Sequence, residues 1–393
     1  MKLLILASRF PYPLEKGDKL RLFHQITYLS QKHEIILCCL NEEKPRQEDL
    51  QKVSALCEEV YVFNIGKTRS LWEMAKAMFK PIPFQVAYFF RKEFLSHIRE
   101  ITQKHKIEHV YCQLLRMGEY AKVEGLPSTI DYMDTFSLGM KRRSEKSPAW
   151  VKPLINWEAW KLAYYEQALF SRFNHHLIIS SQDREALPLS SEQKAQVHIV
   201  PNGIDLDFFS YQASLEKTHE LVFVGNLGYY PNEQAARYLV KSLLPKLSRA
   251  EPGIRLLLAG ARPSQEIRQY SQLPQVDVLG WVDDIRTAYQ SGQIFIAPLF
   301  TGSGQQNKIL EAMALGIPCI TTSIVNDAIG AKEGVEILLA ETVSDFILQI
   351  KKLLDQPGLH ASISRNARKF VESHYSWKLS GAALQKILTK KLV

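Results

Sequence analysis

The chain has 393 residues, of which 46% are hydrophobic and 23% are charged, so it can form two globular domains with cores of their own. It contains no run of 18 apolar residues, which argues against a transmembrane helix and leaves attachment to a membrane surface open. The net charge is +8, with most of the excess in the first 200 residues. A basic surface suits nucleic acid, an anionic membrane or a phosphorylated substrate, and we find no nucleic-acid motif to support the first.

The first residues predict a buried strand rather than a targeting segment. Residues 1–13 pair one lysine with an apolar stretch that is too short for a secretory signal. The five cysteines are odd in number and lack CxxC spacing, which indicates buried, reduced thiols. Both features predict a cytoplasmic protein, with a peripheral position on the inner face of the cytoplasmic membrane left open.

Short strand-like runs alternate with longer helical patterns through the chain, which predicts parallel sheets with helices on both faces. The first series has expected strands at 2–7, 34–40, 59–65, 109–113, 128–133, 175–180 and 197–205. The second series has them at 220–226, 254–260, 276–281, 293–300 and 317–322. We therefore predict an α/β protein of two Rossmann-like, doubly wound domains that face each other across a cleft, where open sheets bind ligands.

The domain boundary is predicted where Pro201 and Gly203 end a strand and a polar, aperiodic segment follows. This assigns residues 1–203 to an N-terminal domain and residues 204–375 to a C-terminal domain. A last helix at about 376–393 is expected to pack back onto the first domain.

Two aromatic-rich stretches of the first domain can be interpreted from their spacing. Trp157, Trp160 and Tyr164 recur at helical spacing within 150–173, a stripe that is typical of a packed core. In 72–94, aromatic and methionine residues alternate with basic ones around two prolines. Helical packing explains this second stretch, and so does a face that rests on an anionic bilayer.

The strongest functional pattern is TGSGQQNKILEAMALGIP at 301–318. A strand leads there into a Gly302-Ser303-Gly304 turn and then into a helix whose first residues are polar. Glycine lets the backbone approach a ligand closely, and unsatisfied N–H groups at a helix N-terminus favour phosphate. The pattern predicts a turn that binds a diphosphate.

Lys308 and Glu311 lie one helical turn apart on the same face of this helix. An exposed lysine in the first turn adds a positive charge for phosphate, and the Glu311 carboxylate can accept two ribose hydroxyls. The spacing suits a nucleoside diphosphate. The alternative interpretation is an ordinary strand-to-helix turn with a solvent-exposed Lys–Glu pair.

These residues resemble the donor site of the family 4 retaining glycosyltransferases of GT-B fold, in which a phosphate-binding turn runs into a KxLEAMAxGxPV helix and strand. The resemblance extends over nearly the whole second half through VPNGIDLDFF at 200–209, LVFVGNLGYYPN at 221–232 and HYSW at 374–377. In the first half, 8–35 and 129–137 are similar to a bacterial branch associated with exopolysaccharide biosynthesis.

The resemblance implies transfer of a sugar from a UDP- or GDP-type donor to the hydroxyl of a glycan or lipid-linked acceptor, with retention of the anomeric configuration. It implies that the first domain binds the acceptor and the second domain binds the nucleotide sugar. It also implies that no metal ion or other cofactor is required. Synthesis of bacterial exopolysaccharide or another cell-surface polysaccharide is the expected role.

The family motif assigns Lys308 to the diphosphate and Glu311 to the ribose. Members often carry a basic pair after the FVG strand, where this chain has Asn226 and Asn232. More of the phosphate charge is therefore expected to fall on Lys308.

Many family members also have a glutamate at the position of Ser303, near the hydroxyls of the donor sugar. Because serine carries no charge, we expect the backbone of the turn to orient the sugar. The expected donor contacts in this turn are Ser303, Gly304, Gln305, Gln306 and Asn307.

Two segments of the first domain supply further candidates. Gly17 comes just before a helix with Asp18 as the expected N-cap, and in the family such a loop lies against the donor phosphates or the acceptor. Asp131 and Asp134 bound a DYMD segment where family members often have a histidine or acid facing the donor sugar. Asp134 is therefore the candidate catalytic group on the acceptor side, with a capping or turn aspartate as the alternative.

Other functions also fit parts of the pattern. A non-catalytic nucleotide-sugar-binding subunit of the same fold would explain the uncharged residues at Ser303, Asn226 and Asn232. A sugar-nucleotide epimerase of similar two-domain shape is a further alternative. A nicotinamide-linked oxidoreductase is disfavoured, because neither domain opens with GxGxxG after its first strand.

Overall fold

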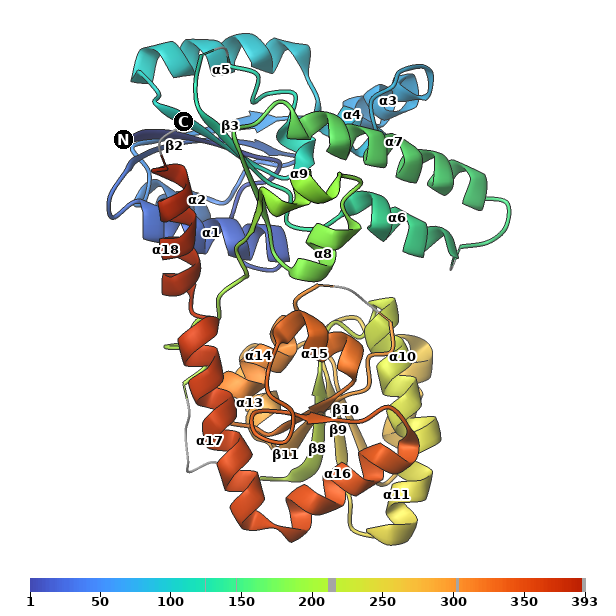
Figure 1. Cartoon of the computed structure of the whole chain (residues 1–393). Coiled ribbons are helices and arrows are strands. Elements are labelled where there is room, and N and C mark those ends of the chain that lie inside the picture. The colour runs from blue at the N-terminus through green and yellow to red at the C-terminus, as the bar shows by residue number, and fades with distance from the viewer. Residues whose placement is uncertain (124, 146, 211–216, 302–303, 391–393) are drawn as a thin grey trace. The chain divides into compact units, whose positions relative to one another are not determined.

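The computed structural model describes residues 1–123, 125–145, 147–210, 217–301 and 304–390. The chain forms two compact units, Met1–Pro201 together with the C-terminal segment from Trp377, and Asn202–Ser376. Each unit contains one sheet in which every neighbouring pair of strands is parallel (Figure 1).

The first sheet has the strand order β3-β2-β1-β4-β5-β6-β7. Its strands are β1 (Lys2–Ala7), β2 (Glu34–Asn41), β3 (Glu59–Asn64), β4 (His109–Gln113), β5 (Ser128–Asp131), β6 (His175–Ile178) and β7 (Val197–Ile199). The order reverses between β1 and β4, which makes the carboxyl ends of these two strands the natural place for a ligand in this unit.

The second sheet has the order β10-β9-β8-β11-β12-β13. Its strands are β8 (His219–Val224), β9 (Leu256–Ala259), β10 (Val276–Leu279), β11 (Gly292–Ala297), β12 (Cys319–Thr321) and β13 (Leu338–Leu339). Here the order reverses between β8 and β11, so the loops that follow β8 and β11 flank the corresponding position.

Helices connect the parallel strands of both units. The first unit has α1 (Gly17–Leu29), α2 (Gln47–Ser54), α3 (Lys67–Lys76), η1 (Ala77–Phe79), α4 (Phe84–Phe89), α5 (Lys92–His105), η2 (Leu115–Met117), α6 (Phe136–Glu145), α7 (Lys152–Phe170), α8 (Ser181–Ala186), α9 (Ser191–Ala195) and α18 (Trp377–Leu388). The second has α10 (Tyr230–Tyr238), η3 (Leu239–Leu243), α11 (Leu244–Ala250), α12 (Gln265–Gln269), η4 (Tyr270–Gln272), α13 (Ile285–Gln290), α14 (Asn307–Ala314), α15 (Ser323–Ile329), α16 (Val343–Asp355) and α17 (Pro357–His374).

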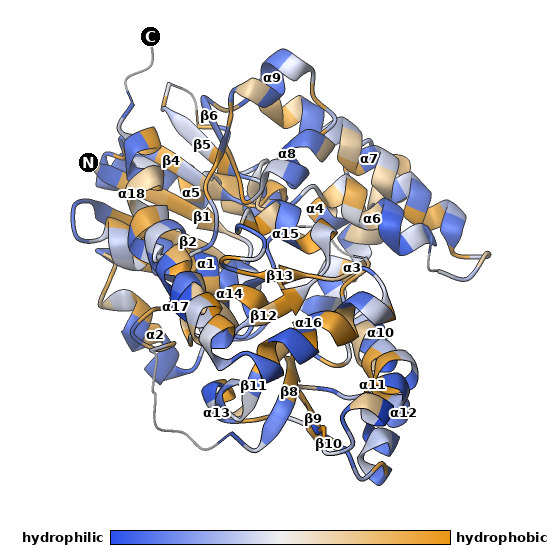
Figure 2. Cartoon of the chain, turned by 60° about the horizontal axis from the view of Figure 1, so that its bottom comes forward, coloured by the Kyte–Doolittle hydropathy of each residue, from blue (hydrophilic) through white to orange (hydrophobic). Residues whose placement is uncertain are grey.

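The inner strands β1, β2, β8 and β11 are largely apolar because the sheets are covered on both faces. Strand β1, for example, buries every residue after Lys2. Figure 2 shows the same division in the second unit, where the strands are hydrophobic and the helices around them carry hydrophilic faces. All five cysteines are free thiols, as their spacing predicts. No helix within the described ranges is long and apolar enough to cross a membrane.

Helix α18 packs against α1 in the first unit (Figure 1). The rings of Trp377 and His24 stack with centroids 4.5 Å apart. Gly381 lies directly against Tyr28, where a Cβ atom would come within 2.3 Å of the ring. The hydroxyl of Ser380 also donates a hydrogen bond to the Pro201 carbonyl, 2.7 Å away.

The prediction of an aromatic core stripe on α7 is wrong. Trp160 and Tyr164 are 64% and 60% exposed, whereas the helix buries Leu162 and Leu169 on its other side. The helical spacing of the aromatic residues gave a wrong prediction because α7 is apolar around most of its circumference. A helical repeat of aromatic residues then indicates a face without indicating which face is covered.

Two histidines at the amino ends of their strands are buried in the uncharged form. His109 and His176 are each 3% exposed, and desolvation lowers the pKa of both to about 4. The ring of His176 stacks on Phe170 with centroids 4.3 Å apart, and His109 bonds to the Thr129 hydroxyl at 2.8 Å. Both side chains must gain a proton when the chain unfolds in mild acid.

We expect the free energy of unfolding to fall as the pH is lowered from about 6.5 to about 4. In this window the unfolded chain binds protons that the folded His109 and His176 do not, which costs up to about 1.4 kcal/mol per pH unit for each histidine. Denaturant titrations at a series of pH values measure this slope. His176→Phe keeps an aromatic ring against Phe170 and removes one titrating group, so the free energy of unfolding should depend less on pH. A slope equal to that of the unmodified chain would contradict the burial of His176 in its uncharged form.

Candidate functional site

The loop between β11 and α14 is held in place by backbone geometry and one side chain. Gly304 has φ +77°, a conformation that favours glycine, and it is buried. The Gln305 amide brackets the backbone of Asn202: its Oε1 accepts from Asn202 N and its Nε2 donates to Asn202 O, both at 2.8 Å. The Gln305 side chain therefore anchors the loop, which leaves its backbone for any ligand. Ser303 and Gly302 lie outside the described residues.

Helix α14 begins at Asn307, with Gln306 as the preceding residue. The first N–H groups of a helix have no partner within the helix. Among the described residues, the buried Oδ1 atom of Asn307 also lacks a hydrogen-bond partner. Since the two ends of an amide side chain are assigned rather than observed, this position offers either an acceptor or a donor.

Lys308 is partly buried, not exposed as the sequence suggested. Its Nζ donates to the Asn232 Oδ1 atom at 2.5 Å and lies 5.6 Å from the centroid of the Phe223 ring. Desolvation lowers the pKa of Lys308 to about 8, and the negative charge of Glu311 offsets part of this shift. The lysine is buried because α14 packs its first turn close to the carboxyl end of β8, where Phe223 lies.

Glu311 is also partly buried, and desolvation raises its pKa. The hydroxyl of Tyr289, on α13, donates to the Glu311 Oε2 atom at 2.7 Å. Tyr289 is only 1% exposed, so this bond gives the carboxylate a fixed orientation. The sequence analysis missed Tyr289, because its partner lies 22 residues further on and neither periodicity nor a motif connects the two.

The turn after β8 brings both predicted asparagines into this cluster. Asn232 Nδ2 donates to the Asn226 carbonyl at 2.9 Å, which turns its Oδ1 toward Lys308. The Asn226 side chain is exposed and accepts from Gly228 N at 3.1 Å. The first turns of α10 and α14, which follow β8 and β11, therefore meet where the strand order reverses, through the contact of Asn232 with Lys308.

The two aspartates of the DYMD segment have different environments in the first unit. Asp131 is fully buried and pairs with the equally buried Arg21, whose Nε lies 2.7 Å from Oδ2. It also accepts hydrogen bonds from Tyr111 at 2.7 Å, Gln25 at 3.2 Å and the Met133 backbone at 3.1 Å. Asp131 is thus a structural residue whose acceptor positions are occupied.

Asp134 keeps contact with solvent three residues further on, after a backbone turn at Met133 with φ +62°. Desolvation by the surrounding protein and the charge of Asp183 raise the pKa of Asp134 to about 6. At neutral pH its carboxylate is largely ionised and can accept a proton or a hydrogen bond. Within the described ranges, no group of three or more His, Cys, Asp or Glu side chains could hold a metal ion.

The predicted N-cap at Asp18 is wrong. Helix α1 begins at Gly17 and the residue before it, Lys16, makes no side-chain capping bond. Asp18 lies inside the first turn, where its carboxylate pairs with Arg9 at 2.5 Å. A negative charge in the first turn of a helix is favourable without capping, so the sequence could not separate the two arrangements. Gly17 itself is exposed, with no atom within 4 Å of the place a Cβ would occupy.

We expect the two DYMD aspartates to differ sharply when each is changed to asparagine. Asp131→Asn leaves Arg21 buried without its counter-charge and should lower the free energy of unfolding by about 3 to 5 kcal/mol. Asp134→Asn removes no hydrogen bond of this kind and should change it by less than about 1 kcal/mol. Denaturant unfolding of both variants provides the measurement, and equal losses would contradict the division of roles.

Comparison with known proteins shows what the chain is similar to. The family model described as glycosyl transferases group 1 matches residues 218–356. An uncharacterised 44.6 kDa protein in the cps region of Klebsiella pneumoniae is 24% identical, over 96% of this chain and 97% of its own. The putative glycosyltransferase EpsF of Bacillus subtilis is 28% identical, over 47% of this chain and 49% of its own.

A third relative and two solved structures extend the comparison. The UDP-Gal:alpha-D-GlcNAc-diphosphoundecaprenol alpha-1,3-galactosyltransferase of Escherichia coli is 21% identical, over 72% of this chain and 75% of its own. HepE from Anabaena, solved in complex with UDP, has a TM-score of 0.70 at 14% identity and covers 99% of this chain and 100% of its own. The same protein with UDP-glucose has a TM-score of 0.68 at 14% identity, with 99% of both chains covered.

The expected fold class is confirmed, since both parallel α/β sheets match those of GT-B structures. The second unit carries the group 1 match, and the protein from the cps region of Klebsiella pneumoniae aligns with nearly the whole chain. The chain therefore resembles the group 1, family 4 glycosyltransferases of GT-B fold, as its sequence indicates.

Proposed function

We propose that this protein transfers a sugar from a UDP- or GDP-type donor to an acceptor hydroxyl with retention of configuration, in the synthesis of a bacterial capsule or exopolysaccharide. The observation that carries the proposal is the partly buried ammonium group of Lys308 at the start of α14. Among the described residues, the only negative charge near the Lys308 ammonium is that of Glu311, one helical turn away.

The diphosphate fits this cation. When the sugar leaves, negative charge develops on the nucleoside diphosphate, and donors already aimed at that position lower the barrier most directly. Lys308 supplies a full charge, and the first turn of α14 adds backbone N–H groups and the helix dipole. Because Asn232 holds the ammonium by a neutral amide, the charge of Lys308 stays available to a phosphate.

Glu311 fits the ribose. Tyr289 uses one position of its Oε2 atom, and the remaining lone pairs of the carboxylate can accept the two ribose hydroxyls. The Lys308–Glu311 spacing of one turn then matches the separation between ribose and diphosphate. Asn226, exposed on the turn after β8, borders the same cluster and is assigned to the donor.

The sugar itself is assigned to the turn before α14. The backbone of Gly304, Gln305 and Gln306, together with the unpaired Oδ1 atom of Asn307, offers hydrogen bonds without a charge. Ser303 belongs to the same turn in the sequence.

In the first unit, the Asp134 carboxylate is assigned the role of accepting hydrogen bonds from the hydroxyls that take part in the reaction on the acceptor side. Gly17 and Asp18 are assigned to the loop that meets the donor phosphates or the acceptor. No metal ion is part of this proposal. Retention is attributed to same-face attack, in which the departing phosphate helps to take the proton from the acceptor.

A lipid-linked acceptor agrees with the printed activity of the Escherichia coli relative and with a surface of the first unit. Leu71, Trp72, Met78 and Phe79, on α3 and η1, are 54%, 63%, 49% and 90% exposed. Helix α7, with exposed Trp160, is tied to this segment because Lys161 donates to the Ala77 and Lys80 carbonyls (Figure 1). Together with the exposed Lys76 and Lys80 they make an apolar-basic surface suited to an anionic membrane.

We expect Lys308→Ala to lower the rate of sugar transfer by about 100-fold or more, because the charge on the leaving diphosphate loses its partner. For the unmodified chain, kcat/KM should fall as the pH rises through about 8, where free Lys308 loses its proton. Lys308→Arg stays charged and should lose this fall. Initial rates of transfer and of donor hydrolysis across pH 6 to 9.5 provide the measurement.

Two results would separate the alternatives. Unchanged transfer by Lys308→Ala would overturn the assignment of the diphosphate. Nucleotide binding by the unmodified chain without any donor hydrolysis or transfer would identify a non-catalytic binding subunit instead. A screen of UDP- and GDP-sugars by thermal shift and hydrolysis identifies the donor.

We expect the chain to co-sediment with vesicles of anionic phospholipid and not with purely zwitterionic vesicles. Replacing Trp72 and Phe79 together by serine should release it, because both side chains are exposed on the apolar-basic surface. Trp281→Ser is the matched control, since Trp281 is 72% exposed in the second unit. Equal sedimentation of all three proteins would remove this surface from the proposal.

A further inference from the structure

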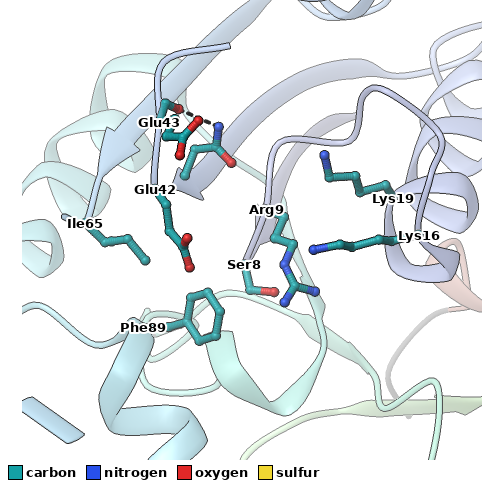
Figure 3. A pocket seen from close by; sticks show the side chains of 9 residues that line it. Ser8, Arg9, Lys16, Lys19, Glu42, Glu43, Ile65 and Phe89 are labelled. Carbon is teal, nitrogen blue, oxygen red and sulfur yellow. Dashed lines mark hydrogen bonds between the residues drawn. The ribbon is translucent and has the colours of Figure 1, made fainter. Parts of the chain in front are cut away.

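A second polar pocket lies in the first unit, at the carboxyl ends of β1, β2 and β3, with a volume of about 230 Å³ (Figure 3). Ser8 directly follows β1, Asn41 ends β2 and Ile65 directly follows β3. The pocket therefore occupies the edge of the sheet where parallel strands present their loops. None of the residues assigned to the diphosphate or ribose above lines it.

One wall of this pocket is basic. Arg9, Lys16 and Lys19 line it, and Figure 3 shows the two lysine side chains on the same side as the Arg9 guanidinium. Arg9 is paired with Asp18, whereas neither lysine forms an ion pair with any described residue. Lys19 donates to the Tyr12 carbonyl at 3.3 Å, and desolvation together with the charge of Lys16 lowers its pKa. The charges of Glu15 and Asp18 offset part of this shift, and the three cations still leave this wall with an excess of positive charge that suits an anion.

The opposite wall accepts hydrogen bonds. Glu42 accepts from the Tyr88 hydroxyl at 2.8 Å, and its other oxygen lies 3.8 Å from Lys67, so its carboxylate is oriented. Figure 3 shows this carboxylate directed into the space between Ser8 and Phe89. Ser8 is 1% exposed, and within the described ranges its buried Oγ has no hydrogen-bond partner. A buried hydroxyl without a partner is costly, which points to a ligand as its missing partner.

The pocket also has one apolar wall. The Phe89 ring lies beside Glu42 and Ser8 in Figure 3. An aromatic ring with polar acceptors beside it suits a sugar, whose C–H face packs on the ring while its hydroxyls reach the acceptors. An inorganic phosphate would leave Glu42 and Ser8 unused, and a neutral glycan would leave Lys16 and Lys19 without a counter-charge.

We propose that this pocket binds the acceptor and that the acceptor is a glycosyl phosphate or diphosphate. The phosphate lies against Lys16, Lys19 and Arg9, and the hydroxyls of its sugar bind Glu42 and Ser8 beside Phe89. This inference rests on the proposed function and specifies the substrate class that the first unit takes. The same chemistry is present in a soluble sugar 1-phosphate and in a lipid-linked sugar diphosphate.

The test begins with binding of three probes to the full chain by calorimetry: α-D-GlcNAc 1-phosphate, inorganic phosphate and free GlcNAc. The sugar phosphate should bind most tightly, because it alone contacts both walls. Lys16→Ser combined with Lys19→Ser should weaken it by about 10- to 100-fold, the effect of losing charge-assisted hydrogen bonds. Glu42→Gln should weaken the sugar phosphate and leave inorganic phosphate unchanged.

Lys32→Ser is the matched control, since Lys32 is an exposed lysine of the same unit that does not line the pocket. It should bind all three probes as the unmodified chain does. Equal affinity for the sugar phosphate and inorganic phosphate would overturn the proposal, and so would unchanged binding in the double lysine variant.

Activity then separates this inference from the proposed function. The double lysine variant should keep donor hydrolysis and lose transfer to both GlcNAc 1-phosphate and a lipid-linked GlcNAc diphosphate, and the acceptor used by the unmodified chain identifies the source. Loss of donor hydrolysis in the variant would assign the lysines to the donor and overturn the inference. If the unmodified chain hydrolyses no donor, the proposed function fails, while the binding experiment still decides whether the pocket takes a sugar phosphate.

Discussion

The parallel pairing of the strands is the constraint on which the rest of the structure depends. Since all strands of a sheet run in one direction, the loops that follow them meet at one edge. In the second unit this brings the turn after β8 to the start of α14, although 76 residues separate Asn232 from Lys308. In the first unit it brings the ends of β1, β2 and β3 around one pocket. Neither cluster could form from segments that are near in sequence.

Both units place a carboxylate beside a tyrosine hydroxyl at this edge. The number of hydrogen-bond donors around each carboxylate distinguishes a structural role from a ligand-binding one. Asp131 accepts hydrogen bonds from Arg21, Tyr111, Gln25 and a backbone N–H, so contacts within the fold occupy its acceptor positions. Glu311 is held by Tyr289 and retains acceptor positions, although desolvation raises its pKa. A carboxylate that costs free energy to bury and is still incompletely paired is the stronger candidate for binding a ligand.

The same reasoning explains why desolvated cations recur at these edges. Burial lowers the pKa of Lys308, and desolvation also lowers that of Lys19, because the ammonium form loses hydration that the protein replaces only in part. A bound anionic ligand would supply negative charge at each of these sites. Lys308 faces a neutral amide, and Lys16 and Lys19 face each other's charge, so each site gains more from a phosphate than an exposed lysine would.

The sequence by itself determined the class of fold and the position of the turn before α14. Alternating strand and helix patterns need only local periodicity, and the Gly-rich turn followed by Lys308 and Glu311 is a contiguous motif, so both could be predicted. Only the tertiary structure decided which side chains complete the sites. Tyr289 reaches Glu311 from another helix, Asp131 is distinguished from Asp134 by partners from β4 and α1, and Trp160 is exposed because α7 packs by its other face. These contacts join residues far apart in the chain, and burial, which sets their pKa shifts and their partners, exists only once the sheets and helices have packed.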